Sequence, residues 1–331
     1  MQNIKNLKVY LESKILASNN VVIVPHMGID FDAIASAIGL SQIAKKLKKP
    51  SCIVVDDPVY KIDSGVQTII EEAKKDFLIV TREKYLQSSN PNDLFILTDV
   101  NKEYLIALKE DIKSKSNVVI IDHHNPDDKT VKSDYSLIDS TYSSASEILV
   151  QLMCQFKIKP TPEVANYLLA GIYLDTNKLT KNVNPETMKI VAKLLEYGAN
   201  MNYVTDLFTE DFISDRRVQD LVSKAKITTY SIAIALADSD CEYTKEELAK
   251  VADYLLKYRV DAAFSIGNIG ENVIAISARS KEKVNVSYIM KQLNGGGHPY
   301  SAATRLTDCS IEEAGKRLQK IIEPIYYTEK A

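Results

Sequence analysis

The chain has 331 residues, of which 45% are hydrophobic and 26% are charged, a composition typical of a globular protein with room for two domains. Its net charge of −3 lacks the basic surplus of proteins that act along nucleic acids, so we expect a small substrate and no long nucleic acid as partner. No apolar run reaches the roughly 18 residues of a membrane-spanning helix, so we expect no membrane contact and a cytoplasmic protein.

The first half of the chain alternates short apolar runs with helical patterns, which predicts a parallel sheet with crossover helices. The expected strands are Val21–Pro25, Cys52–Val55, Phe77–Val80, Leu94–Thr98 and Val118–Ile121. Helices expected between them include Ala33–Lys46 and Gln67–Lys74. The first strand and the last two run directly into histidine or aspartate.

After residue 140 the pattern becomes helical, and strands return after residue 227. The expected helices are Ala145–Gln155, Pro162–Leu174, Pro185–Tyr197, Phe212–Ala225, Lys245–Lys257 and Ile311–Ile322. The expected later strands are Ile232–Ala237, Ala262–Asn268 and Asn272–Ala278. We therefore predict an α/β protein with a parallel-sheet domain over residues 1–183, a helical connector over 184–226 and a smaller α/β domain over 227–331.

Polar residues gather where the strands end. In an open parallel sheet, ligands bind beyond the carboxyl ends of the strands, so residues far apart in sequence can converge there. The first cluster is His26, Asp30 and Asp32, after one strand and before a helix. An aspartate there can cap the helix, whereas an imidazole with two carboxylates suits a divalent metal, and both interpretations stay open.

Three further segments carry the same residue types. Asp99 follows the fourth strand, where it could cap a helix or bind a metal. The triplet Asp122, His123 and His124 follows the next strand, and structural roles for two adjacent imidazoles are hard to arrange. Asp175 ends an apolar helix face, where a buried carboxylate needs a cation, a donor or a metal.

Among these residues two imidazoles and four carboxylates are candidate metal ligands, with His124 close by. Such a set suits two divalent ions that share a carboxylate and hold a phosphoryl group for attack by hydroxide. Mixed nitrogen and oxygen ligands favour two Mn²⁺, with Mg²⁺ or Co²⁺ as substitutes. Because no cysteine belongs to any cluster, structural zinc is disfavoured.

The C-terminal part contains a glycine run, Gly295, Gly296 and Gly297, followed by His298. Consecutive glycines let backbone N–H groups approach a phosphate, although glycine runs are also common in flexible loops. Arg279, at the end of an expected strand, is a second candidate for binding an anion, with a surface salt bridge as its alternative.

In their order these motifs resemble the DHH/DHHA1 phosphoesterases, which carry an HxxxDxD segment, an isolated aspartate, the DHH triplet, a later aspartate and a GGGH loop. The resemblance covers nearly the whole chain and implies a DHH catalytic domain followed by a DHHA1 substrate-binding domain. Within the family, the similarity is greatest to the catalytic half of the cyclic di-AMP phosphodiesterases. It rests on the stretches Ser143–Glu147, Gly171–Asn177, Ile276–Ser280 and Gly295–Thr304.

The resemblance also implies roles. One manganese would be bound by His26, Asp30 and Asp99, and the other by Asp32, Asp99, His123 and Asp175. His124 would contact the scissile phosphate or the attacking water, and Asp122 would orient the triplet. The substrate contacts would come from Ser144, Arg279, Gly295, Gly296, Gly297 and His298.

The function implied is a manganese-dependent phosphodiesterase that opens cyclic di-AMP to pApA, with hydrolysis on to AMP left open. One alternative is a nanoRNase or pAp phosphatase that degrades short oligonucleotides, although that branch more typically has glycine where this chain has Asn177. A second alternative, of another class, is a nucleotide-binding regulator without catalysis. An inorganic pyrophosphatase would share the first domain but not the GGGH loop. A homodimer is expected from the family alone.

Overall fold

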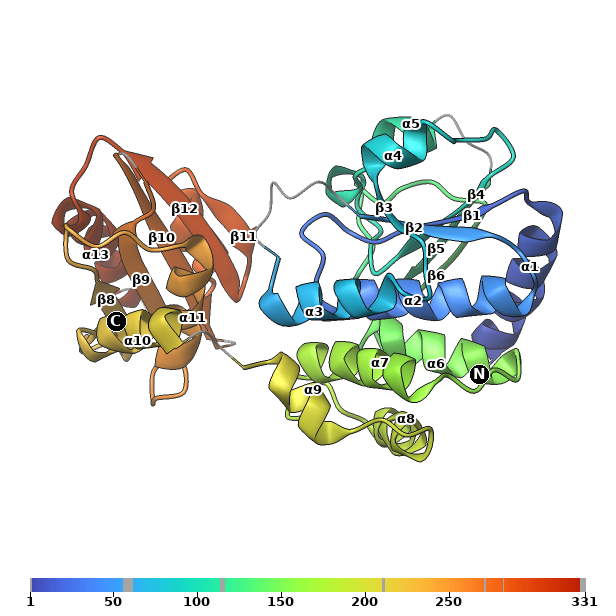
Figure 1. Ribbon diagram of the computed structural model, residues 1–331. Helices are drawn as coiled ribbons and strands as arrows, with labels where there is room; N and C mark the ends of the chain where they lie inside the picture. The colour runs from blue at the N-terminus through green and yellow to red at the C-terminus, as the bar shows by residue number, and fades with distance from the viewer. Residues whose placement is uncertain are drawn as a thin grey trace. The chain divides into compact units, whose positions relative to one another are not determined.

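A computed structural model describes residues 2–55, 62–113, 117–209, 212–270, 272–281 and 283–327. The chain forms two compact units, Met1–Thr209 and Glu210–Ala331, each with its own six-stranded sheet (Figure 1). This architecture confirms the predicted α/β fold with a parallel-sheet N-terminal part and a second, smaller α/β part. Within those ranges, no helix combines the length and the apolar character needed to cross a bilayer.

The sheet of the first unit is parallel throughout, with strand order β3-β2-β1-β4-β5-β6. The strands are β1 (Val21–Val24), β2 (Ser51–Val55), β3 (Ile79–Thr81), β4 (Leu94–Thr98), β5 (Val118–Asp122) and β6 (Tyr135–Ile138). All five predicted strands are present within two residues of their expected bounds. Strand β6 was not predicted because Leu137 is its one buried residue, so the segment lacks an apolar run.

Helices cover both faces of this sheet (Figure 1). Val21 and Ile23 of β1 belong to the hydrophobic core on one face, whereas Val22 and Val24 belong to the core on the other, as the alternation of side chains along a strand requires. The first face carries α1 (Gln2–Ala17), α2 (Phe31–Lys46), α3 (Ser64–Ala73), α6 (Ala145–Gln155) and α7 (Pro162–Asp175). The other carries α4 (Arg82–Leu86), α5 (Lys109–Lys113) and the 3-10 turn Glu103–Leu105.

Helix α2 is the central helix of the first unit, because it lies between the sheet and α7 (Figure 1). It is buried almost all round, which its small and apolar residues allow. Helices α6 and α7 pack against α2 around Gly39, where an added Cβ would make ordinary contacts, 3.5 Å from Leu168 and 3.6 Å from Leu149. The close packing of α2, α6 and α7 fixes the position of the N-terminus of α2, where the first predicted ligands lie.

The helices of the predicted connector over residues 184–226 are divided between the two units. Helices α8 (Pro185–Glu196) and α9 (Met201–Leu207) belong to the first unit, and α10 (Phe212–Ser223) belongs to the second. Asn184 begins α8 with a capping box, as its side chain accepts from the backbone of Glu186 and Thr187.

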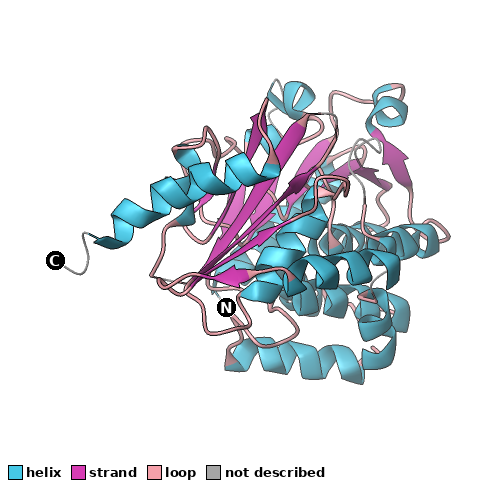
Figure 2. Ribbon diagram, turned by 90° about the vertical axis from the view of Figure 1, so that its left-hand side faces the viewer, coloured by secondary structure: helices cyan, strands magenta, loops and turns pink. Residues whose placement is uncertain are grey.

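The second unit has a mixed sheet with strand order β11-β12-β10-β9-β8-β7. Its strands are β7 (Lys226–Ile227), β8 (Ile232–Leu236), β9 (Ala262–Asn268), β10 (Val273–Ser280), β11 (Gly296–His298) and β12 (Ser301–Thr307). Its further helices are α11 (Lys245–Leu255), α12 (Val286–Lys291) and α13 (Ile311–Tyr327), the last of which packs against β8 and β9 and runs to the C-terminal end in Figure 2. The hairpin β11–β12 was not predicted because its glycine run resembles a loop, and α12 was not predicted because its 6 residues are too few to show a helical period.

Candidate metal centre

The predicted ligands of the first unit converge at one edge of its sheet. His26 lies just beyond β1, Asp99 directly after β4, and Asp122 ends β5, so three neighbouring strands deliver side chains to the same edge. Asp30 is the N-cap of α2, Asp32 lies in its first turn, and Asp175 is the last residue of α7.

The first group of ligand atoms comes from His26, Asp30 and Asp99. The Nε2 atom of His26 lies 3.5 Å from Asp30 Oδ2 and 3.5 Å from Asp99 Oδ2. The other oxygen of Asp30 accepts a hydrogen bond of 3.0 Å from the backbone N–H of Ala33. Asp30 therefore caps the helix with one oxygen and leaves the other for a metal, so the two interpretations of this residue are compatible.

The second group comes from Asp32, His123 and Asp175. His123 Nε2 lies 3.1 Å from Asp175 Oδ2 and 3.9 Å from Asp32 Oδ2. It also lies 3.3 Å from Asp99 Oδ1, the oxygen that the first group does not use. Asp99 thus takes part in both groups, one oxygen in each. This is the arrangement required of a carboxylate that bridges two ions.

Asp32 is held from the far side by the start of α6. Its two oxygens accept hydrogen bonds from the backbone N–H groups of Ala145, at 2.6 Å, and Ser146, at 2.8 Å. These are free donors at a helix N-terminus, which favour a negative charge. Asp32 therefore stabilises the N-terminus of α6 rather than capping its own helix, and its side chain is fully buried.

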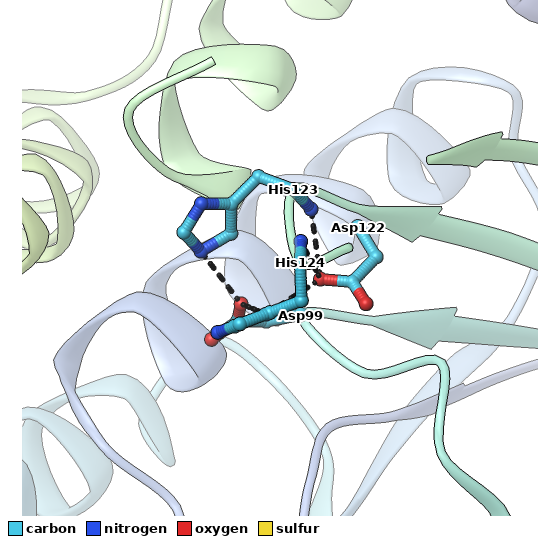
Figure 3. Close-up of side chains that lie close together, drawn as sticks. All are labelled: Asp99, Asp122, His123 and His124. Carbon is cyan, nitrogen blue, oxygen red and sulfur yellow. Dashed lines mark hydrogen bonds and ion pairs between the residues drawn. The ribbon is translucent and has the colours of Figure 1, made fainter. Parts of the chain in front are cut away.

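Asp122 organises the triplet from within (Figure 3). Its Oδ1 atom accepts hydrogen bonds from the backbone N–H of His123 at 2.7 Å, from that of His124 at 3.1 Å and from His124 Nδ1 at 2.9 Å. The ring of His124 is thereby oriented through Nδ1, and its Nε2 remains available to a substrate. With 57% of its side chain exposed, His124 is the accessible member of the triplet.

The polar atoms of this centre are buried without adequate partners. Asp99 Oδ1, His123 Nε2 and Asp175 Oδ2 are inaccessible to solvent, and none makes a hydrogen bond of acceptable geometry to another described residue. Leaving such groups unpaired is costly. Because the ligand atoms within each group lie within 4.8 Å of one another, a divalent cation fits both groups and would satisfy these atoms.

The electrostatics of the centre also favour a bound cation. Burial lowers the pKa of His123, but its contacts with Asp175 and Asp99 outweigh this effect and raise the pKa to about 11. His26 behaves alike, with contacts to Asp30 and Asp99 that raise its pKa to about 11. Burial and the charges of Asp99 and Asp175 raise the pKa of Asp32 well above its ordinary value. The carboxylates of this centre are therefore crowded enough to favour positive charge among them, either a protonated imidazole or a bound cation.

The backbone of Asp99 is unusual. Its φ angle of 57° lies in the left-handed region, which a non-glycine residue seldom adopts. Its backbone N–H donates to the carbonyl of Ile121 at 3.0 Å, which ties this turn to the neighbouring strand β5. The turn after β4 is thus held in a costly conformation at the residue shared by both ligand groups, as is common at functional sites.

Two supporting residues were missed in the sequence. Gly171 of α7 passes so close to α2 that a Cβ there would lie 2.4 Å from Ser146 Oγ and 2.7 Å from Asp32 Oδ1. Asn101 is buried, and its side chain donates to the carbonyl of His124 at 3.0 Å, which joins the loops after β4 and β5. A glycine in an apolar helix ahead of Asp175 was a signal for the first, whereas nothing in the sequence indicated the second.

Ser144 is used as a helix cap in the structure. It is fully buried at the N-terminus of α6, where its hydroxyl accepts a hydrogen bond of 3.0 Å from the backbone N–H of Glu147. The substrate contact expected of Ser144 stays a prediction.

A cavity of about 760 Å³ in the second unit is lined by Arg279 and by the three glycines Gly295, Gly296 and Gly297. Arg279 Nε pairs with Asp253 Oδ1 at 3.1 Å, so the salt bridge considered for this arginine is present while the residue also faces the cavity. A Cβ added at Gly295 would lie 2.3 Å from the carbonyl oxygen of Ala303, whereas a Cβ added at Gly296 would have no atom of another described residue within 4 Å, its chain neighbours apart. The side chain of His298 lies outside the described part of the structure.

These residues therefore have different reasons to be glycine. Gly295 packs against β12, and Gly297 has a φ angle of 138° that favours glycine. Gly296 alone leaves its backbone open for the approach of a ligand. The run forms one strand of a hairpin with β12 rather than an irregular loop.

Known proteins match the chain in both units. Residues 20–172 match the family model of the DHH family, N-terminal domain, and residues 227–325 match that of the DHHA1 domain. Cyclic-di-AMP phosphodiesterase GdpP of Geobacillus thermodenitrificans is 30% identical over 96% of this chain and 49% of its own length. A membrane protein-large ribosomal subunit bL9 fusion protein of Onion yellows phytoplasma is 32% identical over 92% of this chain and 37% of its own length. The chain thus spans less than half of each relative.

A solved structure supports the fold over the full length. The exopolyphosphatase-related protein from Bacteroides fragilis superposes with a TM-score of 0.81 at 22% identity, covering 99% of this chain and 98% of its own. The two matches follow each other along the chain, with the DHH domain first and the DHHA1 domain second. The chain belongs to the DHH/DHHA1 family of phosphoesterases.

Proposed function

We propose that this protein is a manganese-dependent phosphodiesterase that opens cyclic di-AMP to the linear dinucleotide pApA. The observation that carries the proposal is the meeting of two ligand groups at Asp99, with buried polar atoms that lack partners. The identity of 30% with a cyclic-di-AMP phosphodiesterase over 96% of the chain favours this substrate over others of the family.

The proposed ligands follow from the two groups. His26, Asp30 and Asp99 would hold one Mn²⁺, and Asp32, Asp99, His123 and Asp175 the other. Bound there, the ions would lower the pKa of a water molecule and offset the charge of the phosphoryl group. Both imidazoles must be neutral to bind a metal, so any proton that they carry must leave when the metal binds.

His124 is the residue proposed to touch the substrate. Asp122 holds its Nδ1 and raises the pKa of the imidazole, which favours the protonated ring whose Nε2 can donate. Water would attack phosphorus, the bond from phosphorus to the 3′ oxygen would break, and that oxygen would take a proton to become a hydroxyl. We assign His124 to bind a phosphoryl oxygen or to supply that proton.

For the second unit we propose the binding of a nucleotide phosphate. The cavity lined by Arg279 offers a guanidinium, and Gly296 offers backbone that no side chain screens. Because Asp253 already pairs with Arg279, an incoming phosphate would have to share the guanidinium with this carboxylate or displace it.

The test is a side-by-side assay of the purified protein with Mn²⁺ on cyclic di-AMP, pApA, pAp and a short RNA. We expect cyclic di-AMP to have the highest kcat/KM, with pApA as product, and we expect chelation to abolish turnover and Mn²⁺ to restore it. A preference for pAp or short RNA would overturn the substrate and favour a role in RNA turnover. Binding of cyclic di-AMP without turnover at saturating Mn²⁺ would overturn catalysis itself.

A further inference from the structure

A polar cavity adjoins the metal centre inside the first unit. It measures about 530 Å³, within the range of sites for small ligands, and His123 and His124 form part of its wall. The loop after β6 contributes Thr141, and the loop between α7 and α8 contributes Asn182 and Asn184. We call this cavity the His124 pocket. Because His123 also belongs to the second ligand group, a group bound in the pocket is contiguous with the reacting atoms.

The lining of the His124 pocket is polar but lacks formal charge. None of the described residues that line it is an aspartate, glutamate, lysine or arginine, and the histidines stand only where it borders the metal centre. A site for a phosphate usually presents arginine, lysine or a run of backbone N–H groups. The pocket is therefore suited to a neutral part of a substrate that forms hydrogen bonds.

Several polar groups of the pocket are available for such bonds. The exposed side chains of Asn125 and Asn182 make no hydrogen bond to any other described residue, so each offers an amide donor and an acceptor. Asn184 uses its Oδ1 atom to cap α8, which leaves its amide nitrogen as a donor. The hydroxyl of Thr141 donates to Asp139 and can still accept. This mixture matches the hydroxyls of a ribose and the ring nitrogens of a base.

We propose that the His124 pocket is a nucleoside subsite, which binds the ribose and base attached to the scissile phosphate. The inference rests on the proposed function, since it assigns one part of a dinucleotide to one part of the first unit. Asn125, Asn182 and Asn184 determine the affinity for this nucleoside, and the metal ligands perform the chemistry. These three asparagines therefore act on KM rather than on kcat.

Three variants test the subsite. Asn182→Gly removes the amide at a position whose φ angle of 52° glycine also tolerates, and Asn125→Ala removes a second amide. Ser140→Phe fills the pocket from an exposed position in its wall. The matched control is Asn202→Ala, an exposed asparagine on α9 outside the pocket. Each full-length variant is assayed with Mn²⁺ on cyclic di-AMP, and its affinities for pApA, for pApA that lacks one base and for Mn²⁺ are measured by calorimetry.

We expect each asparagine variant to raise KM for cyclic di-AMP about three- to tenfold, the effect of one lost hydrogen bond, with kcat and Mn²⁺ affinity unchanged. Ser140→Phe should raise KM further, and all three should bind pApA with less preference over its abasic form than the wild type does. Unchanged KM in all three variants would overturn the subsite, as would a fall in Mn²⁺ affinity with KM constant. If the wild type cleaves no dinucleotide, the proposed function and the subsite are both overturned. If the wild type cleaves and the variants cleave equally well, only the subsite is overturned.

Discussion

Gly171 provides a direct test of how the metal centre is assembled. Substitution by alanine adds a methyl group 2.4 Å from Ser146 Oγ, 2.7 Å from Asp32 Oδ1 and 3.0 Å from Asp32 Cα. Real Cβ atoms do not approach other atoms so closely, so α7 must move away from α2 or Asp32 must shift. Either movement disturbs the carboxylate that accepts hydrogen bonds from Ala145 and Ser146.

The expected magnitudes follow from two opposing effects. Overpacking of this kind typically costs about 1–3 kcal/mol of stability, and alanine regains about 1 kcal/mol over glycine inside a helix. The net loss for Gly171→Ala is then up to about 2 kcal/mol. Gly39→Ala is the matched control, because its added Cβ would make ordinary contacts at 3.5 Å and 3.6 Å. For that variant the helix propensity dominates, and we expect unchanged or slightly higher stability.

The activity of the two variants separates the centre from the fold. Displacing Asp32 should lower Mn²⁺ affinity or turnover about 10- to 100-fold in Gly171→Ala, the effect typical of residues that orient ligands. Gly39→Ala should keep both. The measurements are denaturant unfolding, Mn²⁺ titration and kcat/KM on cyclic di-AMP. A Gly171→Ala protein with the stability, Mn²⁺ affinity and turnover of the wild type would show that the contact with Asp32 has no consequence.

Three further predictions concern other parts of the molecule. Asp99→Ala should lose more activity than the about 10- to 100-fold typical of orienting residues, since it disturbs both ligand groups, and near-normal turnover would refute the assignment of the metals. The pKa of His26 and that of His123 are both raised to about 11, so metal binding must release protons and Mn²⁺ affinity should rise between pH 6 and 8. Calorimetry in buffers of different ionisation enthalpy measures the protons released, and a Mn²⁺ affinity that does not change with pH would contradict the prediction. Gly295→Ala should destabilise the protein by about 1–3 kcal/mol through its clash with Ala303. Gly296→Ala should have the unfolding free energy of the wild type and a higher KM. Equal unfolding free energies of the two variants would contradict the different roles assigned to these glycines.

The parts of the fold that could be predicted from the sequence are those with a strong local signal. Strands β1, β4 and β5 are buried on both faces and therefore appear as continuous apolar runs. Strand β6 and the hairpin β11–β12 have no such run, because their residues alternate between buried and exposed or are glycine. The convergence of polar residues at the strand ends could also be predicted, since it follows from parallel topology alone.

The pairing of residues within the centre could not be predicted in the same way. The hydrogen bonds from Ala145 and Ser146 to Asp32 join residues 113 and 114 positions apart and depend on how α6 meets α2. The need for glycine at position 171 arises from the same packing, since the residue it would obstruct belongs to another helix. Asn101 has no local signal, because its role is to join two loops that only the sheet brings together.

The choice between helix cap and metal ligand shows why local sequence could not decide the roles of the aspartates. A carboxylate has two oxygens, and each can serve a different partner. Asp30 caps α2 with one oxygen and faces His26 with the other, and Asp32 joins the N-terminus of α6 while its Oδ2 lies 3.9 Å from His123. The same side chains therefore tie the helices to the sheet edge and form the centre. It follows that the packing of the helices sets the geometry of the proposed metal ligands, which is the rigidity that a catalytic metal centre requires.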